Sequence, residues 1–271
     1  MKKGISVTDS PEKPAGEERK VTLLSSAAID GAPLSYIIAL AAVAAVLAFV
    51  PFSTILTFGG SFPLSQGVFP LIGWILGPVA GALASAIGRL IGIFLAPHTA
   101  GAVPLASVWG AAIGSFAAGT MSGRDRGRSW WWIPLAFLFV AEWLLFIGRG
   151  VLVNGVDVGV AILYSFIHWS SLILYILPTR VLFARWIRSE NALQMALGLF
   201  FGTWMAAAFA HLSVGVILYY MFNWPNEVWV TLIPIIPIEN AFRGLVGAVI
   251  GTGVIQGLRA VGLVKPKWAL Y

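Results

Sequence analysis

Between Pro33 and Thr120 the chain carries a single Asp, Glu, Lys or Arg residue, which is Arg89. Of all 271 residues, 59% are hydrophobic and 10% are charged, whereas a soluble domain usually carries about 25% charged residues. A water-soluble fold of this length cannot hide so much apolar surface. The apolar runs are long and continuous, and in lipid such a run satisfies its backbone only as a helix. We therefore expect an all-α, polytopic helical bundle in the cell membrane.

A helix needs roughly 20 residues to cross the hydrocarbon core of a membrane. By this measure the chain contains about eight apolar runs that could form spans. These runs are Leu34–Pro51, Pro63–Leu76, Pro78–Leu95, Pro104–Met121, Trp131–Ile147, Val158–Leu177, Ala192–Phe222 and Val230–Leu258. The polar residues 1–32 are predicted to form a disordered cytoplasmic tail. Residues 33–264 then make the transmembrane domain, and residues 265–271 make a second cytoplasmic tail.

The second and third runs meet at Gly77 and Pro78 without a polar loop. Because Pro78 lacks an N–H group and disfavours helical geometry at Gly77, either two short helices meet there or one long helix is broken. The expected number of spans is therefore eight, with seven as the alternative.

Four short hydrophilic segments hold 14 of the 17 Lys and Arg residues. One is the N-terminal tail, and the other three contain Arg124, Arg126 and Arg128; Arg180, Arg185 and Arg188; and Arg259, Lys265 and Lys267. With eight spans, all four segments fall on the same side, as the positive-inside rule requires if both termini are cytoplasmic. We therefore attribute the net charge of +6 to membrane orientation and expect no nucleic-acid partner.

Several classes of chemistry lack their usual residues. The chain has no cysteine, which excludes disulfides, thiolate metal sites and cysteine nucleophiles. Its three histidines, His98, His168 and His211, form no HExxH pair, and no Walker A motif is present. We therefore expect neither a metal nor a cofactor, and we do not expect an enzyme.

Six Arg, Glu or His residues and one asparagine lie inside the apolar runs, where such groups are costly and usually face a partner or a cavity. If both termini are cytoplasmic, most of them lie at similar depth in the outer half of the membrane, so we predict that they bind a substrate. They are Arg89, Glu142, His168, His211, Glu239, Asn240 and Arg243. The alternative is structural pairing, either between Glu239 and Arg243 at i,i+4 spacing or between Arg89 and Glu142.

Two glycine-rich stretches carry a family resemblance. The first is GGSFPLSQGVFPLIGWILGPVAGALASAIGRLIG (Gly59–Gly92), and the second is IPIENAFRGLVGAVIGTGVIQGL (Ile236–Leu258). They resemble the substrate-binding S-components of energy-coupling factor (ECF) vitamin transporters, of which this chain would be a divergent member with more than the usual six or so spans.

The resemblance implies a membrane-embedded binder of a vitamin or precursor, docked on a transmembrane coupling subunit that two ATPase subunits drive. In this family the first helix docks through closely spaced small residues. Here Ala41 and Ala45 match that pattern, as do Ala44 and Ala48.

A buried arginine offers a planar fork of donors that suits a carboxylate or a phosphate. We therefore expect Arg89 and Arg243 to face an anionic or zwitterionic solute, with Glu142 and Glu239 balancing the charge when the site is empty. A flat ring would stack on aromatic residues, of which the candidates are Trp74, Trp109, Trp143, Trp169 and Tyr164.

Two other functions stay open. A membrane enzyme acting on a lipid or isoprenoid would use Glu142, His168 and His211 as acid–base groups. A stand-alone secondary transporter would show an inverted repeat, but the Gly-Pro motif near residue 77 has no counterpart near residue 210.

Overall fold

The computed structural model describes residues 27–55, 60–121 and 130–271, and helices dominate this part of the chain. The α-helices are α2 (Leu34–Val46), α3 (Phe69–Leu76), α4 (Pro78–Leu95), α5 (Pro104–Gly119), α6 (Trp132–Leu152), α7 (Val158–Tyr164), α8 (Phe166–Ile176), α9 (Thr179–Ile187), α10 (Ala192–Met221), α11 (Asn226–Leu232) and α12 (Ile235–Val261). The 3-10 helices are η1 (Leu47–Phe49), η2 (Leu64–Gly67) and η3 (Pro97–Thr99). Two antiparallel hairpins pair β1 (Ala28–Ile29) with β2 (Ala32–Pro33) and β3 (Pro51–Ile55) with β4 (Gly60–Pro63).

In the described part of the chain, four helices are long and apolar enough to cross a membrane, namely α4, α6, α10 and α12. Helices α7 and α8 pass the same test as a pair and would make a fifth span, although they are bent by 60°. The prediction of an all-α, multi-pass membrane protein is confirmed in this coarser form.

The break predicted at Gly77 and Pro78 is confirmed, and two helices meet there. Gly77 has φ 87° and ψ 176°, a backbone conformation that residues with a side chain rarely adopt. The preceding helix α3 has eight residues, so at 1.5 Å per residue it is far shorter than the bilayer. The second apolar run is therefore not one straight spanning helix, because η2 and the end of β4 occupy its first residues.

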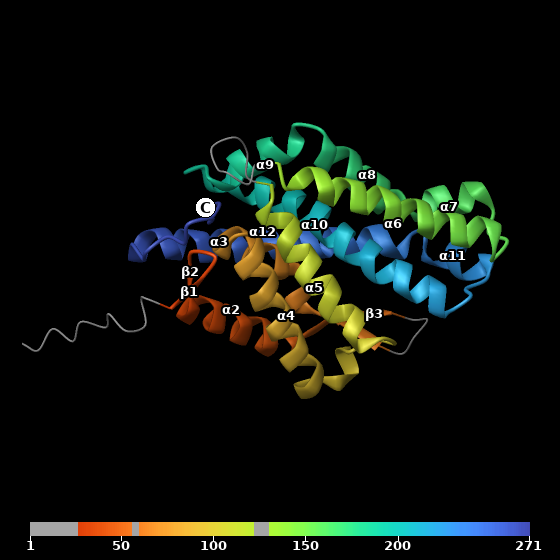
Figure 1. Ribbon diagram of the computed structural model, residues 1–271, viewed down its shortest axis with the longest axis horizontal. Coiled ribbons are helices and arrows are strands. Elements are labelled where there is room, and N and C mark those ends of the chain that lie inside the picture. The colour runs from red at the N-terminus through yellow and green to blue at the C-terminus, as the bar shows by residue number, and fades with distance from the viewer. Residues whose placement is uncertain (1–26, 56–59, 122–129) are drawn as a thin grey trace, which may run out of the picture.

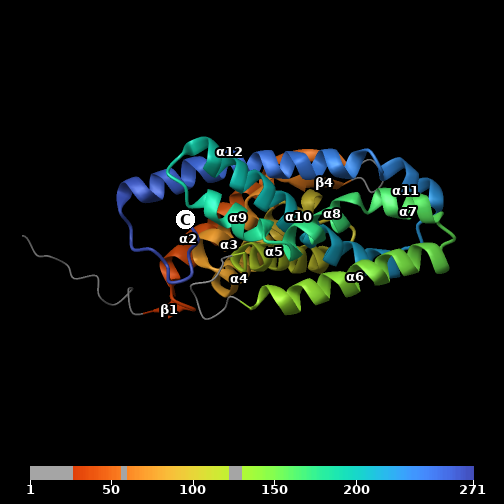
Figure 2. The ribbon, with the colours of Figure 1, turned by 90° about the horizontal axis from the view of Figure 1, so that it is seen from above.

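Helix α10 lies at the centre of the molecule and contacts α5, α6, α8, α9 and α12. Figure 2 shows α12 and α6 on opposite sides of α10, and all three run along the long axis of the molecule. Helix α4 packs between α2 and α5 (Figure 1). The chain thus surrounds α10 with helices that come from both halves of the sequence.

Small residues allow α2 and α4 to approach closely. A Cβ atom added to Gly88 would lie 2.6 Å from the carbonyl oxygen of Ala41 and 2.7 Å from the Cβ of Ala44. Ala41 and Ala45 are 4% and 5% exposed, and Ala44 and Ala48 are fully buried. This corrects the prediction that Ala41 and Ala45 dock a partner, because α4 of the same chain packs against and buries these alanines.

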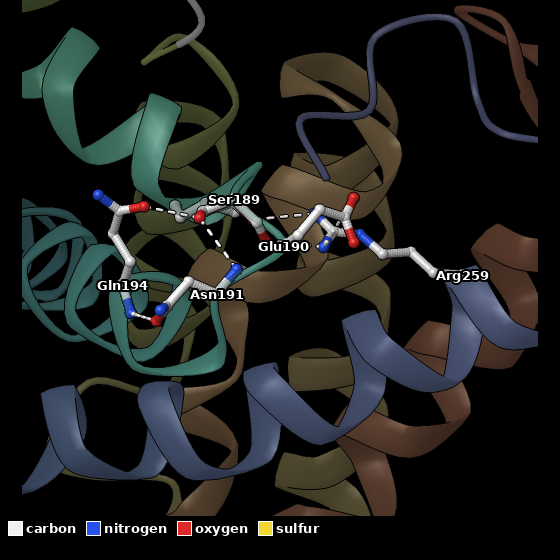
Figure 3. Close-up of polar contacts among 6 residues, drawn as sticks. Ser189, Glu190, Asn191, Gln194 and Arg259 are labelled. Carbon is white, nitrogen blue, oxygen red and sulfur yellow. Dashed lines mark hydrogen bonds and ion pairs between the residues drawn. The ribbon is translucent and has the colours of Figure 1, made fainter.

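The basic C-terminal end of α12 is hydrogen-bonded to the turn between α9 and α10 (Figure 3). Arg259 donates from Nη1 to the carbonyl oxygen of Ser189 at 2.9 Å and from Nη2 to that of Ile187 at 3.3 Å. The Glu190 carboxylate lies 4.0 Å from the same guanidinium group. Two of the basic segments found in the sequence therefore meet at one end of the bundle.

The residues that follow α12 fold back onto α3 and the β1–β2 hairpin. The backbone N–H of Leu270 donates to the carbonyl oxygen of Trp74 at 2.6 Å, and that of Lys267 donates to Gly31 at 3.1 Å. Leu270 and Tyr271 are 2% and 6% exposed. The segment predicted as a C-terminal tail is thus packed against the bundle. Residues 1–26 of the predicted N-terminal tail lie outside the described residues.

Candidate functional site

A cavity of about 160 Å³ lies where α4, α5, α10 and α12 meet, and α3, α7, α11, η2 and η3 also contribute to its wall. Most of the wall is apolar, but Arg89 from α4, His211 from α10, and Glu239 and Arg243 from α12 all line it. Four of the seven residues that the sequence predicted for substrate binding therefore meet at one cavity.

The guanidinium group of Arg243 is held by contacts from three other residues. Its Nε donates to Oε1 of Gln66 at 2.9 Å, and its Nη2 lies 3.8 Å from Oε2 of Glu239. The guanidinium carbon lies 4.5 Å from the centre of the Phe62 ring. The ion pair expected from the i,i+4 spacing is therefore present. The Nη1 atom is buried and has no hydrogen-bond partner among the described residues.

Arg89 is 2% exposed, and its hydrogen-bond partners in the described part of the chain are all neutral. Its Nε donates to Oγ of Ser107 at 3.0 Å, its Nη1 donates to Oγ1 of Thr99 at 3.3 Å, and its Nη2 donates to the Thr99 carbonyl oxygen. These bonds join α4 to η3 and α5. No ion pair found in residues 27–55, 60–121 and 130–271 includes Arg89. The proposed pair with Glu142 is not formed, since that carboxylate accepts a hydrogen bond from Ser213 at 2.7 Å.

The buried His168 and the half-buried His211 are neighbours, although 43 residues separate them in the sequence. Nε2 of His168 lies 2.9 Å from Nδ1 of His211, and the rings stack with their centroids 5.2 Å apart. His211 is on the cavity wall, whereas His168 lies behind it and is 1% exposed. The pair thus connects α8 with the wall of the cavity.

Three predicted site residues do not line the cavity, namely Glu142, His168 and Asn240. Asn240 donates from Nδ2 to the carbonyl oxygen of Trp204 on α10 at 3.0 Å. One residue advances a helix by about 100°, so Asn240 lies on a different face from its neighbour Glu239. Depth in the membrane, which the sequence predicted, does not decide which face of a helix a residue occupies.

The aromatic part of the wall differs from the prediction. Tyr164 lines the cavity as expected, together with Phe69, Tyr219 and Trp224. The four tryptophans that were expected beside Tyr164 lie elsewhere: Trp74, Trp109, Trp143 and Trp169. A flat ligand would therefore meet a different set of rings from the one that the sequence suggested.

Sequence reasoning missed three polar residues that hold the arginines in place: Gln66, Thr99 and Ser107. All three are uncharged and lie at or beyond the ends of helices, where polar residues are ordinary. The sequence contained no signal that would have selected them, because their role depends on how η2 and η3 fold back onto α12 and α4.

No group of three or more His, Asp or Glu residues in the described part of the chain is arranged to hold a metal ion. No protein-family model matches the chain, and no curated protein and no solved structure matches it significantly. The fold and the cavity thus define a class: an all-α, multi-pass membrane protein with a cavity that carries charged side chains.

Proposed function

We propose that this protein binds a small anionic or zwitterionic solute in its cavity and acts as the substrate-binding subunit of an ECF-type uptake transporter. The observation that carries the proposal is that Arg243 lines the cavity while its Nη1 atom has no hydrogen-bond partner among the described residues. Leaving a buried, charged donor unsatisfied is costly, whereas a carboxylate or phosphate bonded to it would stabilise the protein.

The family assignment rests on the two glycine-rich stretches, and their place in the fold supports it. Gln66, Phe69 and Arg89 come from the first stretch, and Glu239 and Arg243 come from the second. All five line the same cavity. The stretches that carry the resemblance are therefore the ones that supply the charged wall.

We also propose eight passes with both termini in the cytoplasm. The contact of Arg259 with the α9–α10 turn supports this topology, because it gathers basic segments at one end of the bundle. Three elements that border the cavity are α7, α11 and η3. They follow α6, α10 and α4, and each lies at the end of that helix that is farther from the basic segments. The positive-inside rule then puts the cavity in the outer half of the membrane.

Uptake would require partners, since the chain has no Walker A motif of its own. We propose a transmembrane coupling subunit and ATPase subunits. They would dock on a face other than the one formed by Ala41 and Ala45, because α4 covers those residues.

The membrane-enzyme alternative is less well supported by the geometry. Of its three proposed acid–base groups, only His211 lines the cavity, and Glu142 is bonded to Ser213 instead. The alternative of a stand-alone secondary transporter lacks the inverted sequence repeat that would support it.

A thermal-shift screen of the purified protein in detergent tests the proposal, with vitamins, their precursors and small anionic metabolites as ligands. A ligand that binds only the folded state adds about 2.7 kcal/mol of stability at a hundredfold excess over its dissociation constant. We expect at least one hit that is lost in Arg243→Gln. The hit should persist in Arg149→Gln, because Arg149 bonds Asn223 and does not line the cavity. A folded protein that responds to no compound would contradict the proposal.

A further inference from the structure

The surroundings of Arg243 leave one nitrogen of its guanidinium group without a hydrogen-bond partner among the described residues. Gln66 accepts from Nε at 2.9 Å, Glu239 lies 3.8 Å from Nη2, and the Phe62 ring covers one face at 4.5 Å. The side chain is 2% exposed, so these contacts fix it in a buried position. Nη1 alone has no partner among the described residues, and Arg243 is part of the cavity wall.

The second arginine of the cavity is differently engaged. Each nitrogen of the Arg89 guanidinium group already donates a hydrogen bond, to Ser107 or to Thr99. These bonds fix η3 and the start of α5 against α4. Arg89 therefore supports the wall and contributes charge, whereas Arg243 has one donor nitrogen without a partner among the described residues.

The charges on the wall do not cancel. The charged residues that line the cavity in the described part of the chain are Arg89, Glu239 and Arg243. With His211 neutral, their formal sum is +1. A ligand with one negative charge would make the filled cavity neutral, whereas a dianion would leave an excess of negative charge and a zwitterion an excess of positive charge, each in a largely apolar environment.

The volume of the cavity limits the rest of the ligand. An apolar protein cavity of roughly 150 Å³ binds benzene, and this cavity has about 160 Å³. Its remaining wall includes Phe69, Val214 and Leu218, which offer apolar surface and no charge. The body of the ligand is thus compact, apolar and about as large as one six-membered ring.

From these observations we infer that the cavity selects a compact monoanion: a single carboxylate or comparable acid group that bonds Nη1 of Arg243, joined to an apolar body of about one ring. This inference rests on the proposed function and narrows its solute class. Gln66 and Glu239 are positioning residues, because they orient the guanidinium group without contacting the acid group.

Isothermal titration of the full-length protein in nanodiscs tests the inference with three probes. Benzoate has the inferred charge and size, benzamide has the same shape without the charge, and terephthalate carries a second carboxylate. We expect benzoate to bind at least tenfold more tightly than benzamide and more tightly than terephthalate. This comparison needs no variant, so a failure of any variant to fold does not affect it.

Three variants then assign the charge preference to residues. Arg243→Gln is expected to abolish the preference for benzoate over benzamide, while the matched control Arg149→Gln retains it. Glu239→Gln raises the formal charge of the wall to +2. We expect that variant to raise the affinity for terephthalate relative to benzoate at least tenfold, a change that a merely structural role of Glu239 would not produce.

The outcomes separate the two proposals. If benzamide equals benzoate, if terephthalate binds more tightly to the unmodified protein, or if Arg243→Gln keeps the preference, the inference is overturned. It is also overturned if benzoate does not bind while a zwitterionic, dianionic or larger anionic solute from the thermal-shift screen binds, and the proposed function then survives. If only neutral solutes bind, both proposals fail. If the folded protein binds neither the probes nor any compound of the screen, both fail.

Discussion

Nε2 of His168 on α8 lies 2.9 Å from Nδ1 of His211 on α10, which makes this pair a polar link between two helices that pack through apolar side chains. A hydrogen bond between membrane helices contributes on average about 0.6 kcal/mol, with a maximum of about 1.7 kcal/mol. Since His211 is also on the cavity wall, the link positions a polar group of the site.

A double-mutant cycle measures this link. We expect His168→Leu and His211→Leu to be coupled by about 0.6 to 1.7 kcal/mol in the free energy of unfolding, because either single change removes the same bond. The measurement is reversible unfolding in mixed detergent micelles. Strictly additive effects would show that the two rings contribute nothing through their contact.

Arg89→Lys tests whether the fork of the arginine, rather than its charge, holds α4, η3 and α5 together. A lysine ammonium group cannot reach Ser107 and both Thr99 oxygens in the same geometry. We expect a loss of about 1 to 3 kcal/mol in unfolding free energy. Arg149→Lys, which alters one bond to Asn223 in a less buried position, is the control. Equal losses in the two variants would mean that the buried fork has no special structural role.

Gly88→Ala is expected to destabilise the packing of α2 on α4. The new Cβ would lie 2.6 Å from the carbonyl oxygen of Ala41, and overpacking of this kind costs about 1 to 3 kcal/mol. The control is Gly253→Ala on α12, whose added Cβ meets nothing within 4 Å. That change should be neutral or stabilise by less than about 1 kcal/mol. Thermal unfolding of both variants in one detergent compares them, and a neutral Gly88→Ala would contradict the close approach.

Gly77→Ala separates two effects at the α3–α4 junction. Gly77 has φ 87°, and an added Cβ would lie 2.4 Å from the Cβ of Trp268. Gly155 also has a positive φ, of 67°, but an added Cβ there has no neighbour within 4 Å. Both alanine variants carry backbone strain of about 1 kcal/mol or more, and only the first also displaces Trp268. We therefore expect a larger fall in melting temperature for Gly77→Ala. Equal falls would show that the contact of Gly77 with Trp268 does not contribute to stability.

Cysteine labelling tests the orientation, and the chain has no native cysteine that would have to be removed first. His98→Cys puts a thiol in η3 beside the cavity, and Gln194→Cys puts one at the start of α10 near the Arg259 contact. Both positions are exposed. In intact cells, a membrane-impermeant maleimide should label the first variant and not the second, with both labelled after lysis. The reverse pattern would put the cavity on the cytoplasmic side.

The long uncharged stretches around Arg89 were sufficient to predict the fold class, because a backbone in lipid can satisfy itself only locally. Local chemistry also predicted the break at Gly77 and Pro78 and the pair of Glu239 with Arg243, since each depends on residues within one turn. The number of spans was harder to predict from the sequence, because two of the apolar runs do not form one straight helix each. The helix pair α7 and α8 bends by 60°, and η2 precedes a helix of only eight residues.

The sequence by itself determined that the protein is a bundle of apolar helices, and it narrowed the site to a few ionisable residues in those helices. Only the tertiary structure decided that Arg89, His211, Glu239 and Arg243 share one cavity while Glu142 and Asn240 face elsewhere. It also decided that the alanines of α2 pack against Gly88 within the chain. The physical reason is that hydropathy depends on composition along the chain, whereas the partner of a buried side chain depends on how each helix is rotated and which helix lies beside it.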